Sequence, residues 1–466
     1  MSKKYSILIL AAGEGTRMRS SSIPKVMHTL CGVPLIQRVI KASMPIPQEK
    51  IGIVVGYGNE KIKEELKKQK NIELIPQKKQ MGSGNAVQSA KNWLQHVSKS
   101  SSHILVVCGD TPLISSETLL SFCNFHLKQE NNASILSFKT SQPFGYGRIV
   151  RDQNLRVQKI VEEKDATLEE KNIDEVNSAI YCFEIKKLLE ILPHLKNNNA
   201  KKEYYLTDVI EHFYNKRLKV DAFQSGARNG LAIKETMGIN TRVELSMAEE
   251  FLQEKIRNYW MEQGVTMLNP SSIYIEEKVT IGKDTLLLPQ TMLLGATKIG
   301  ERCKIGPSSF IENSNIGENT VVRASFIYGS TIGNKVEIGP YTHLRTGSVV
   351  QDEARIGNFT EIKNSNIGKE TKVSHLAYIG DSILGEKINV GAGAITCNFD
   401  GKNKHKTTIG SQSFVGSNVN LIAPVKVGAR SVLAAGSTIT EDVPSDSLAI
   451  ERTSLVIKKG WVKKRK

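Results

Sequence analysis

The chain is poor in the residues that assign proteins to several common classes. Its 466 residues include six cysteines, nine histidines and three tryptophans, and aromatic residues make up 6% of the total. The histidines show no metal-ligand spacing, and the cysteines are scattered without a C-x-x-C pair: Cys31, Cys108, Cys123, Cys182, Cys303 and Cys397. This pattern argues against a disulfide framework and against a zinc site, so we expect reduced thiols and a cytoplasmic protein.

Long apolar runs are also missing. No stretch approaches the roughly 20 apolar residues that a membrane-spanning helix needs, and the first residues lack the pattern of a secretory signal. Nucleic-acid-binding motifs are absent as well, although the net charge is +16. We therefore expect no membrane span and no nucleic-acid partner, and phosphorylated small molecules as the anions that this charge attracts. The basic end of the chain, KKGWVKKRK, is expected to be a solvated tail.

Two frequent nucleotide-binding motifs are incomplete. The segment LILAAGEGTRMRSSSIPKVMH has Gly13 and Gly15, but Met18 occupies the third glycine position of a dinucleotide-binding motif. The spacing of a P-loop is absent too. Glycines still let backbone N–H groups approach a phosphate closely, so the segment predicts a nucleotide site of another kind.

The features that are present divide the chain into two halves. Over 1–235, apolar runs such as YSILILAAG and HILVVCGD alternate with helical patterns. This alternation predicts an α/β domain with a mostly parallel, Rossmann-like sheet covered by helices on both faces. Ligands of such sheets bind beyond the carboxyl ends of the strands, where AAGEGTR and CGD lie. Apolar residues at three-four spacing then predict a connecting helix over 243–264.

From about residue 265, aliphatic residues recur every six positions, with occasional slips of one residue. Neither a helix nor an ordinary strand keeps such a period, so the pattern predicts a triangular solenoid that resembles the left-handed parallel β-helix. The period is lost between Thr396 and Ile409, which predicts a loop that leaves the coil. The inward positions are expected at Ile281, Leu287, Leu293, Ile299, Ile305, Ile311, Ile316, Val322, Ile332, Ile338, Leu344, Ile356, Ile362, Ile367, Val373, Ile379, Ile409, Val415, Leu421, Val427, Leu433 and Ile439.

Ordered motifs in both halves carry a family resemblance. LAAGEGTRM…PK, QMGSGNA, VVCGD and GYGR resemble sugar-1-phosphate nucleotidyltransferases, and VEEKD, VNSAI, NNNAKKEYYLTD and MGINTR extend the match. With the solenoid behind them, residues 5–452 resemble the bacterial bifunctional N-acetylglucosamine-1-phosphate uridylyltransferase / glucosamine-1-phosphate N-acetyltransferase family. The resemblance implies a uridylyltransferase domain at 1–240, a linker helix at 241–264, a β-helix acetyltransferase domain at 265–452 and a basic tail at 453–466. It also implies a homotrimer formed through the β-helix.

In the first reaction that the resemblance implies, a sugar-1-phosphate oxygen attacks the α-phosphorus of UTP and pyrophosphate leaves. Arg17 and Lys25 would neutralise charge at the triphosphate, and Asp110 and Asn240 would hold Mg²⁺. The resemblance places the other contacts with UTP and the sugar at Leu10, Ala11, Ala12, Gly13, Gln77, Gly82, Ser83, Gly147, Glu162, Asn177 and Tyr205, together with Asn240.

In the second reaction, the amine of glucosamine-1-phosphate attacks acetyl-CoA and needs a base near neutral pH. Histidine suits this role best, and His375 lies in the matching motif SHLAYIGD. The resemblance assigns Arg345 and Lys363 to the phosphate and Tyr378 and Asn389 to the sugar. It assigns acetyl-CoA to Ala392, Asn398, Phe399, Ser417, Ala435 and Arg452, with the Ala392 N–H at the oxyanion.

Two alternatives stay open at this point. One is a sugar-1-phosphate nucleotidyltransferase of single activity with a structural or regulatory β-helix, against which Arg345, Lys363 and His375 count. The other is a non-enzymatic interaction protein that combines the same two folds, against which the charged residues of the first half count. The chain also departs from the family pattern, since Thr346 replaces a proline and Phe399 replaces a tyrosine, which removes one hydroxyl.

Overall fold

The computed structural model describes residues 5–56, 60–67, 69, 71–224 and 234–465. The chain divides into two compact units, one ending at Glu250 and the other beginning at Phe251. No helix among these described residues is long and apolar enough to cross a membrane.

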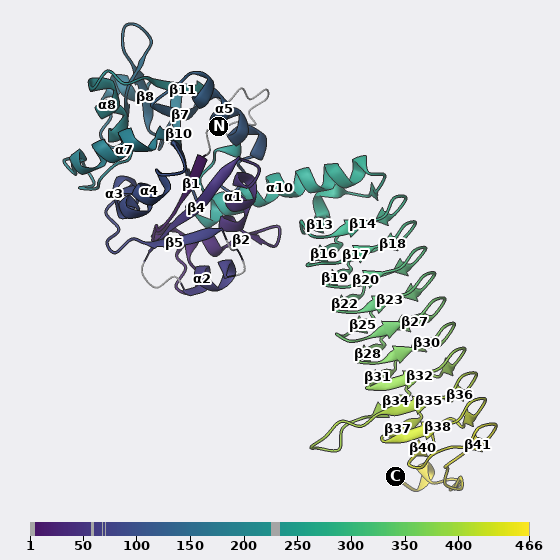
Figure 1. Ribbon diagram of the computed structural model, residues 1–466. Helices are drawn as coiled ribbons and strands as arrows, with labels where there is room; N and C mark the ends of the chain where they lie inside the picture. The colour runs from purple at the N-terminus through teal and green to yellow at the C-terminus, as the bar shows by residue number, and fades with distance from the viewer. Residues whose placement is uncertain (1–4, 57–59, 68, 70, 225–233, 466) are drawn as a thin grey trace. The chain divides into compact units, whose positions relative to one another are not determined.

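The central sheet of the first unit is mostly parallel, which confirms the prediction (Figure 1). β1 pairs in parallel with both β4 and β6, whereas β10 runs antiparallel to its two neighbours in the sheet, β6 and β7. Two further strands, β8 (Arg148–Arg151) and β9 (Val157–Val161), pair with each other, and β8 also pairs with β10. The order of the sheet is β11 (Val220–Gln224), β7 (Ala133–Lys139), β10 (Glu175–Glu184), β6 (His103–Cys108), β1 (Tyr5–Ala11), β4 (Gln48–Val55) and β5 (Ile72–Pro76).

Helices cover both faces of this sheet because its strands alternate their side chains between two cores. Ile7 and Ile9 belong to one core, with α1 (Leu35–Ser43), α2 (Glu60–Leu66) and α5 (Ser116–Lys128). Leu8 belongs to the other core, with α3 (Ser83–Ser89), α4 (Lys91–Val97), α7 (Ile185–Ile191) and α8 (Asp208–Asn215). A short helix, α6 (Leu168–Lys171), lies outside these two cores.

The helix α10 (Arg242–Glu262) occupies the segment in which a connecting helix is predicted. A capping box starts it: the Thr241 hydroxyl accepts the Glu244 N–H at 3.1 Å, and the Glu244 carboxylate accepts the Thr241 N–H at 2.8 Å. Its second half belongs to the second unit, because Ile256 and Trp260 pack on the solenoid core. The domain boundaries themselves stay predictions.

The second unit is a solenoid of parallel strands, which confirms the predicted left-handed β-helix class (Figure 1). Within residues 251–465, all of them described, one face has eleven strands from β12 (Thr266–Met267) to β41 (Leu448–Ala449). The second face has ten strands from β13 (Tyr274–Ile275) to β40 (Thr438–Ile439), and the third has nine from β14 (Thr280–Ile281) to β38 (Val425–Val427). All 22 predicted inward positions are buried, none more than 6% exposed.

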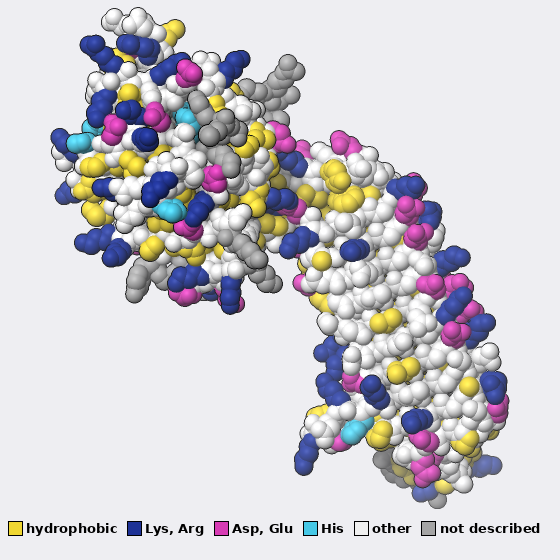
Figure 2. All heavy atoms as spheres, viewed as in Figure 1, with side chains coloured by type: hydrophobic (Ala, Val, Ile, Leu, Met, Phe, Trp, Pro, Cys, Tyr) yellow, Lys and Arg dark blue, Asp and Glu magenta, His cyan; other side chains and the backbone are white. Residues whose placement is uncertain are grey.

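The predicted loop leaves the solenoid between β34 (Ile395–Cys397) and β35 (Thr407–Ile409) and extends away from it (Figure 1). Acidic and basic side chains gather along one edge of the solenoid (Figure 2). Ion pairs of the solenoid include Arg302 with Glu318 at 2.6 Å and Lys369 with Glu353 at 3.6 Å. These side chains are about half exposed, which is typical of a solvated edge.

Candidate active sites

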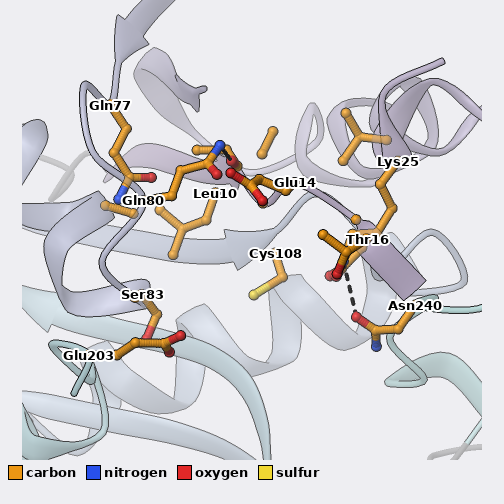
Figure 3. Close-up of a pocket in the computed structure, with 18 residues that line it drawn as sticks. Leu10, Glu14, Thr16, Lys25, Gln77, Gln80, Ser83, Cys108, Glu203 and Asn240 are labelled. Atoms are coloured by element: carbon orange, nitrogen blue, oxygen red, sulfur yellow. Dashed lines mark hydrogen bonds and ion pairs between the residues drawn. The ribbon is translucent and has the colours of Figure 1, made fainter. Parts of the chain in front are cut away.

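A cavity of about 530 Å³ opens at the carboxyl ends of β1 and β6, where the sequence predicts the nucleotide site. Figure 3 shows Gln77, Gln80 and Ser83 on one side of this cavity and Lys25 and Asn240 on the other. The predicted residues that line it are Leu10, Ala11, Ala12, Gly13, Lys25, Gln77, Gly82, Ser83, Asp110 and Asn240.

Backbone hydrogen bonds bring Asp110 and Asn240 together from distant parts of the chain. The Gly109 N–H donates to the Leu10 carbonyl at 2.9 Å, which places Asp110 beside the end of β1. The Ile239 N–H donates to the Asp110 carbonyl at 2.8 Å, so the next residue, Asn240, lies against Asp110. Glu244 of the capping box also accepts the Asn240 N–H at 2.6 Å, which fixes that backbone at the start of α10.

The Lys25 ammonium lies between the two predicted metal ligands. It donates to the Asp110 carboxylate and to the Asn240 amide oxygen, the latter at 3.1 Å (Figure 3). The Lys25 and Asp110 side chains are 11% and 20% exposed. A carboxylate and an amide oxygen that converge on one cation are a donor set that Mg²⁺ accepts, with phosphates and water as further ligands. The residues present therefore fit the predicted ion.

Glycines allow the close approaches that shape this cavity. Gly15 has a φ of +65°, and a Cβ there would lie 2.7 Å from the Cβ of Lys25. Gly82 has a φ of +101°, and a Cβ there would lie 2.6 Å from the Tyr204 carbonyl oxygen. The Gly84 N–H donates to that same carbonyl at 2.7 Å, so the segment around Tyr204 packs directly on the cavity wall.

Two of the four predicted sugar-binding residues line a second, smaller cavity, whereas Gly147 lies just before β8 and Asn177 lies on β10. Glu162 and Tyr205 line this cavity of about 350 Å³. Burial raises the pKa of Glu162 above its usual value, and the Tyr205 hydroxyl is buried without a hydrogen-bond partner among the described residues. The Asn177 N–H donates to the Gly147 carbonyl at 2.9 Å, so these two predicted residues are neighbours.

In the solenoid, successive coils stack the residues predicted for acetyl transfer. His375 is exposed, and its Nδ1 lies 2.9 Å from the Asn358 amide oxygen on the preceding coil. Arg345 pairs with Glu361 at 3.0 Å. Tyr378 lies in register opposite Glu361, and Asn389 lies opposite Lys372.

A buried carboxylate organises the part of the solenoid that is predicted to bind phosphate. Asp381 accepts an amide N–H from Asn364 at 2.7 Å and another from Asn398 at 2.5 Å, and it lies 3.9 Å from Lys363. Burial alone would raise the pKa of Asp381, but these amides and the nearby lysines lower it. The side chain of Lys404, which comes from the projecting loop, lies close to Lys363 and lowers its pKa. Two adjacent cations on a half-open surface are suited to an anion.

The residues predicted for acetyl-CoA lie at successive turns of the solenoid. The Asn418 N–H donates to the Ala392 carbonyl at 2.8 Å, and the Gly436 N–H donates to the Ser417 carbonyl at 2.8 Å. Ala392, Ser417 and Ala435 therefore lie near one corner. Phe399 is 59% exposed on the projecting loop, and Arg452 is exposed beyond β41.

Comparison with known proteins agrees with both halves. A nucleotidyl transferase family matches residues 6–266, and a bacterial transferase hexapeptide family (six repeats) matches residues 406–441. Bifunctional protein GlmU of Halalkalibacterium halodurans is 43% identical over 465 residues, which cover 100% of both chains. Bifunctional protein GlmU of Geobacillus sp. strain WCH70 is 46% identical over 462 residues, covering 99% of this chain and 98% of the relative. That of Clostridioides difficile strain 630 is 44% identical with the same coverage.

The chain belongs to the bifunctional GlmU family. Membership confirms the predicted enzyme with two activities, a uridylyltransferase and an acetyltransferase. This excludes the two alternatives left open by the sequence: a nucleotidyltransferase of single activity whose β-helix is only structural or regulatory, and a non-enzymatic interaction protein.

The structure does not bring every predicted residue to the larger cavity, and it places there some residues that the sequence did not single out. Arg17 is exposed and does not line the larger cavity. Glu14, Gln80 and Glu203 line it without having been predicted. Gln80 donates to the Ala12 carbonyl, and its place in the motif QMGSGNA was the available signal. Lys404 had no signal beyond its place in the loop.

Proposed function

We propose that the two sites carry out consecutive steps in the synthesis of UDP-N-acetylglucosamine. The solenoid site acetylates glucosamine-1-phosphate from acetyl-CoA, and the cavity of the first unit transfers a uridylyl group from UTP to the product. The observation that carries the proposal is the convergence of Lys25, Asp110 and Asn240 on one point at the wall of the larger cavity.

For uridylyl transfer, the sugar phosphate oxygen attacks the α-phosphorus of UTP, and pyrophosphate leaves. Mg²⁺, held by Asp110 and Asn240, would neutralise phosphate charge. Lys25 supplies a fixed positive charge at the same point, and the backbone of Gly13 and Gly15 approaches the triphosphate. Gln77, Gly82 and Ser83 lie on the opposite wall, where they are suited to the nucleoside.

For acetyl transfer, the amine of glucosamine-1-phosphate attacks the thioester carbon of acetyl-CoA. His375 accepts the proton that the amine loses, the Ala392 N–H stabilises the oxyanion, and CoA leaves with its sulfur protonated. Arg345 and Lys363 hold the phosphate of the substrate. The proximity of Lys404 to Lys363 adds a further cation to that phosphate site.

We also propose that the enzyme is a cytoplasmic homotrimer. Outward positions of the solenoid strands expose large apolar side chains, among them Phe326, Ile395 and Phe414 at 51%, 42% and 46%. Such side chains are suited to burial against further copies of the chain. Light scattering on the full chain should give about three times 51.6 kDa, and a monomer would contradict the trimer.

Two assays on the wild-type chain test the catalytic proposal. One follows free CoA release from acetyl-CoA with glucosamine-1-phosphate, and the other follows pyrophosphate release from UTP with N-acetylglucosamine-1-phosphate. We expect both, with the second abolished by EDTA and restored by Mg²⁺. Absence of CoA release would contradict the acetyltransferase assignment, and pyrophosphate release in EDTA would contradict the metal site.

A further inference from the structure

Two neighbouring strands of the solenoid are longer than the rest. In residues 251–465, all of which are described, the other solenoid strands have two or three residues. β27 (Arg355–Asn358) and β30 (Lys372–His375) have four each and pair in parallel. Their last residues, Asn358 and His375, lie opposite each other in the register. The fold therefore extends its ladder at one place, and this extension ends at His375.

The extension depends on an unusually close approach of the two coils. A Cβ added to Gly357 would lie 1.7 Å from the carbonyl oxygen of Ser374, so no larger residue fits there. The Thr342 hydroxyl holds the Gly357 carbonyl at 2.6 Å, which fixes this backbone from the other side. The close approach lets Asn358 contact the next coil twice: its carbonyl accepts the Leu376 N–H at 3.0 Å, and its side chain contacts His375.

We propose that Asn358 is a positioning residue that selects the reactive tautomer of His375, an inference that rests on the proposed role of His375 as the base. The amide oxygen of Asn358 lies 2.9 Å from Nδ1 and can only accept a hydrogen bond. Nδ1 must then carry the proton, which leaves a free lone pair on Nε2. The imidazole is thus held with Nε2 ready to accept a proton from the amine.

The strands that flank β30, whose residues are all described, place no charged side chain opposite His375, so the Asn358 amide determines the orientation of its ring. β30 lies between β27 and β33 (Asn389–Val390), and the charged residue on these flanking strands is Arg355. Arg355 lies opposite Lys372, at the far end of β30 from His375. The adjacent corner presents the apolar side chains of Phe359 and Leu376, which are 58% and 62% exposed. A neutral acceptor in this setting orients the ring without adding charge.

Two substitutions of Asn358 separate orientation from mere folding. Asn358→Leu keeps the approximate size and removes the acceptor, so kcat of acetyl transfer should fall about tenfold while KM for glucosamine-1-phosphate changes less than about twofold. Asn358→Asp keeps an oxygen acceptor and adds a negative charge, so kcat should be largely retained. The charge favours the imidazolium, so the acidic limb of the pH profile should move up by about one unit. Asn315→Leu, on the outward side of a distant coil, is the matched control.

A second measurement reports on His375 without relying on catalysis. Diethyl pyrocarbonate modifies neutral imidazole, so its rate on the peptide containing His375, followed by mass spectrometry across pH, gives the pKa of that ring. We expect a higher pKa in Asn358→Asp than in the wild type. If His375→Ala retains acetyl transfer, the proposed base is wrong. If His375→Ala is inactive but both Asn358 variants keep the wild-type kcat and pH profile, the positioning role alone is wrong.

Discussion

The two units build their sites over very different distances along the chain. In the first unit, Lys25 contacts Asn240, 215 residues away, and the contact requires the sheet and the start of α10 to be complete. In the solenoid, Asn358 contacts His375 across 17 residues, the length of one coil. The first site therefore depends on the topology of a whole domain, whereas the second depends on the spacing between neighbouring coils. This difference predicts that damage to either site stays within its own unit.

The largest expected effect comes from removing one essential side chain in each unit. Asp110→Ala should lower uridylyl transfer by about 10³-fold, since it leaves the Lys25 ammonium and the proposed Mg²⁺ without their carboxylate. His375→Ala should lower acetyl transfer by about 10²- to 10⁴-fold. Each variant should keep the other activity within about twofold, as measured by pyrophosphate and CoA release. If either variant lost both activities while staying soluble and in an unchanged oligomeric state, the two sites would not be independent.

The next effect concerns the long-range packing of the first unit. Gly82→Ala places a Cβ 2.6 Å from the Tyr204 carbonyl, so the cavity wall must shift and uridylyl transfer should fall about tenfold or more. Gly264→Ala, in the second unit, is the matched control, because its φ is also positive, at +91°, but the nearest atom to its Cβ would lie 3.6 Å away. It should keep uridylyl transfer at the wild-type level, and equally high activity in Gly82→Ala would contradict the predicted clash with Tyr204.

Much of this arrangement could be predicted because the signals are local. A six-residue period identifies the solenoid, since every inward residue repeats the same environment. CGD follows a buried strand, so Asp110 is expected at the edge of the sheet. TRVE forms the capping box that holds Asn240, although the sequence was interpreted there only as a helix.

The remaining features depend on contacts that no local pattern encodes. The approach of Lys404 to Lys363 depends on the path of the projecting loop. The extension of β27 to Asn358 depends on how closely Gly357 meets Ser374 on another coil. The exposure of Arg17, which the family resemblance places at the triphosphate, depends on the turn around Thr16 and Met18.

A smaller effect is expected on thermal stability, where two carboxyl groups, one in each unit, should act in opposite directions. Burial first, then Glu211, Glu162 and Asp165, raises the pKa of Asp208 to about 6, whereas the pKa of Asp381 is lowered. As pH rises from about 4 to 6, unfolded chains lose the Asp208 proton before folded ones do, so this group lowers the free energy of unfolding. Asp208→Asn should therefore raise the melting temperature at pH 8.

Asp381 has the opposite effect on the free energy of unfolding, because its pKa is lowered in the folded chain. Its lowered pKa contributes stability above the unfolded value of about 3.9, and that stability is lost as pH falls through the folded value. Asp381→Asn should therefore lower the melting temperature at pH 8, with the difference shrinking toward acidic pH. Thermal unfolding at pH 4 and pH 8 checks Asp208→Asn, and a series from pH 8 to below pH 3 checks Asp381→Asn. A stabilised Asp381→Asn at pH 8 would contradict the assignment.

The smallest effect is expected on KM, from a substitution on the projecting loop that restores the family pattern. Phe399→Tyr adds a hydroxyl to a side chain that is 59% exposed beside the acetyltransferase site. One added neutral hydrogen bond should lower KM for glucosamine-1-phosphate by about two- to fivefold, with kcat unchanged. Initial rates of CoA release across substrate concentrations measure this effect, and an unchanged KM would show that this hydroxyl makes no contact with the sugar.

Two independent sites that act in sequence should complement each other when they are intact on different molecules, and a mixing experiment tests this most directly. Asp110→Ala and His375→Ala, each purified alone, are mixed with glucosamine-1-phosphate, acetyl-CoA, UTP and Mg²⁺, and UDP-N-acetylglucosamine is quantified. Each variant alone should yield almost no product, whereas the mixture should yield it, with free N-acetylglucosamine-1-phosphate as the intermediate. A mixture as inactive as its components would contradict the account.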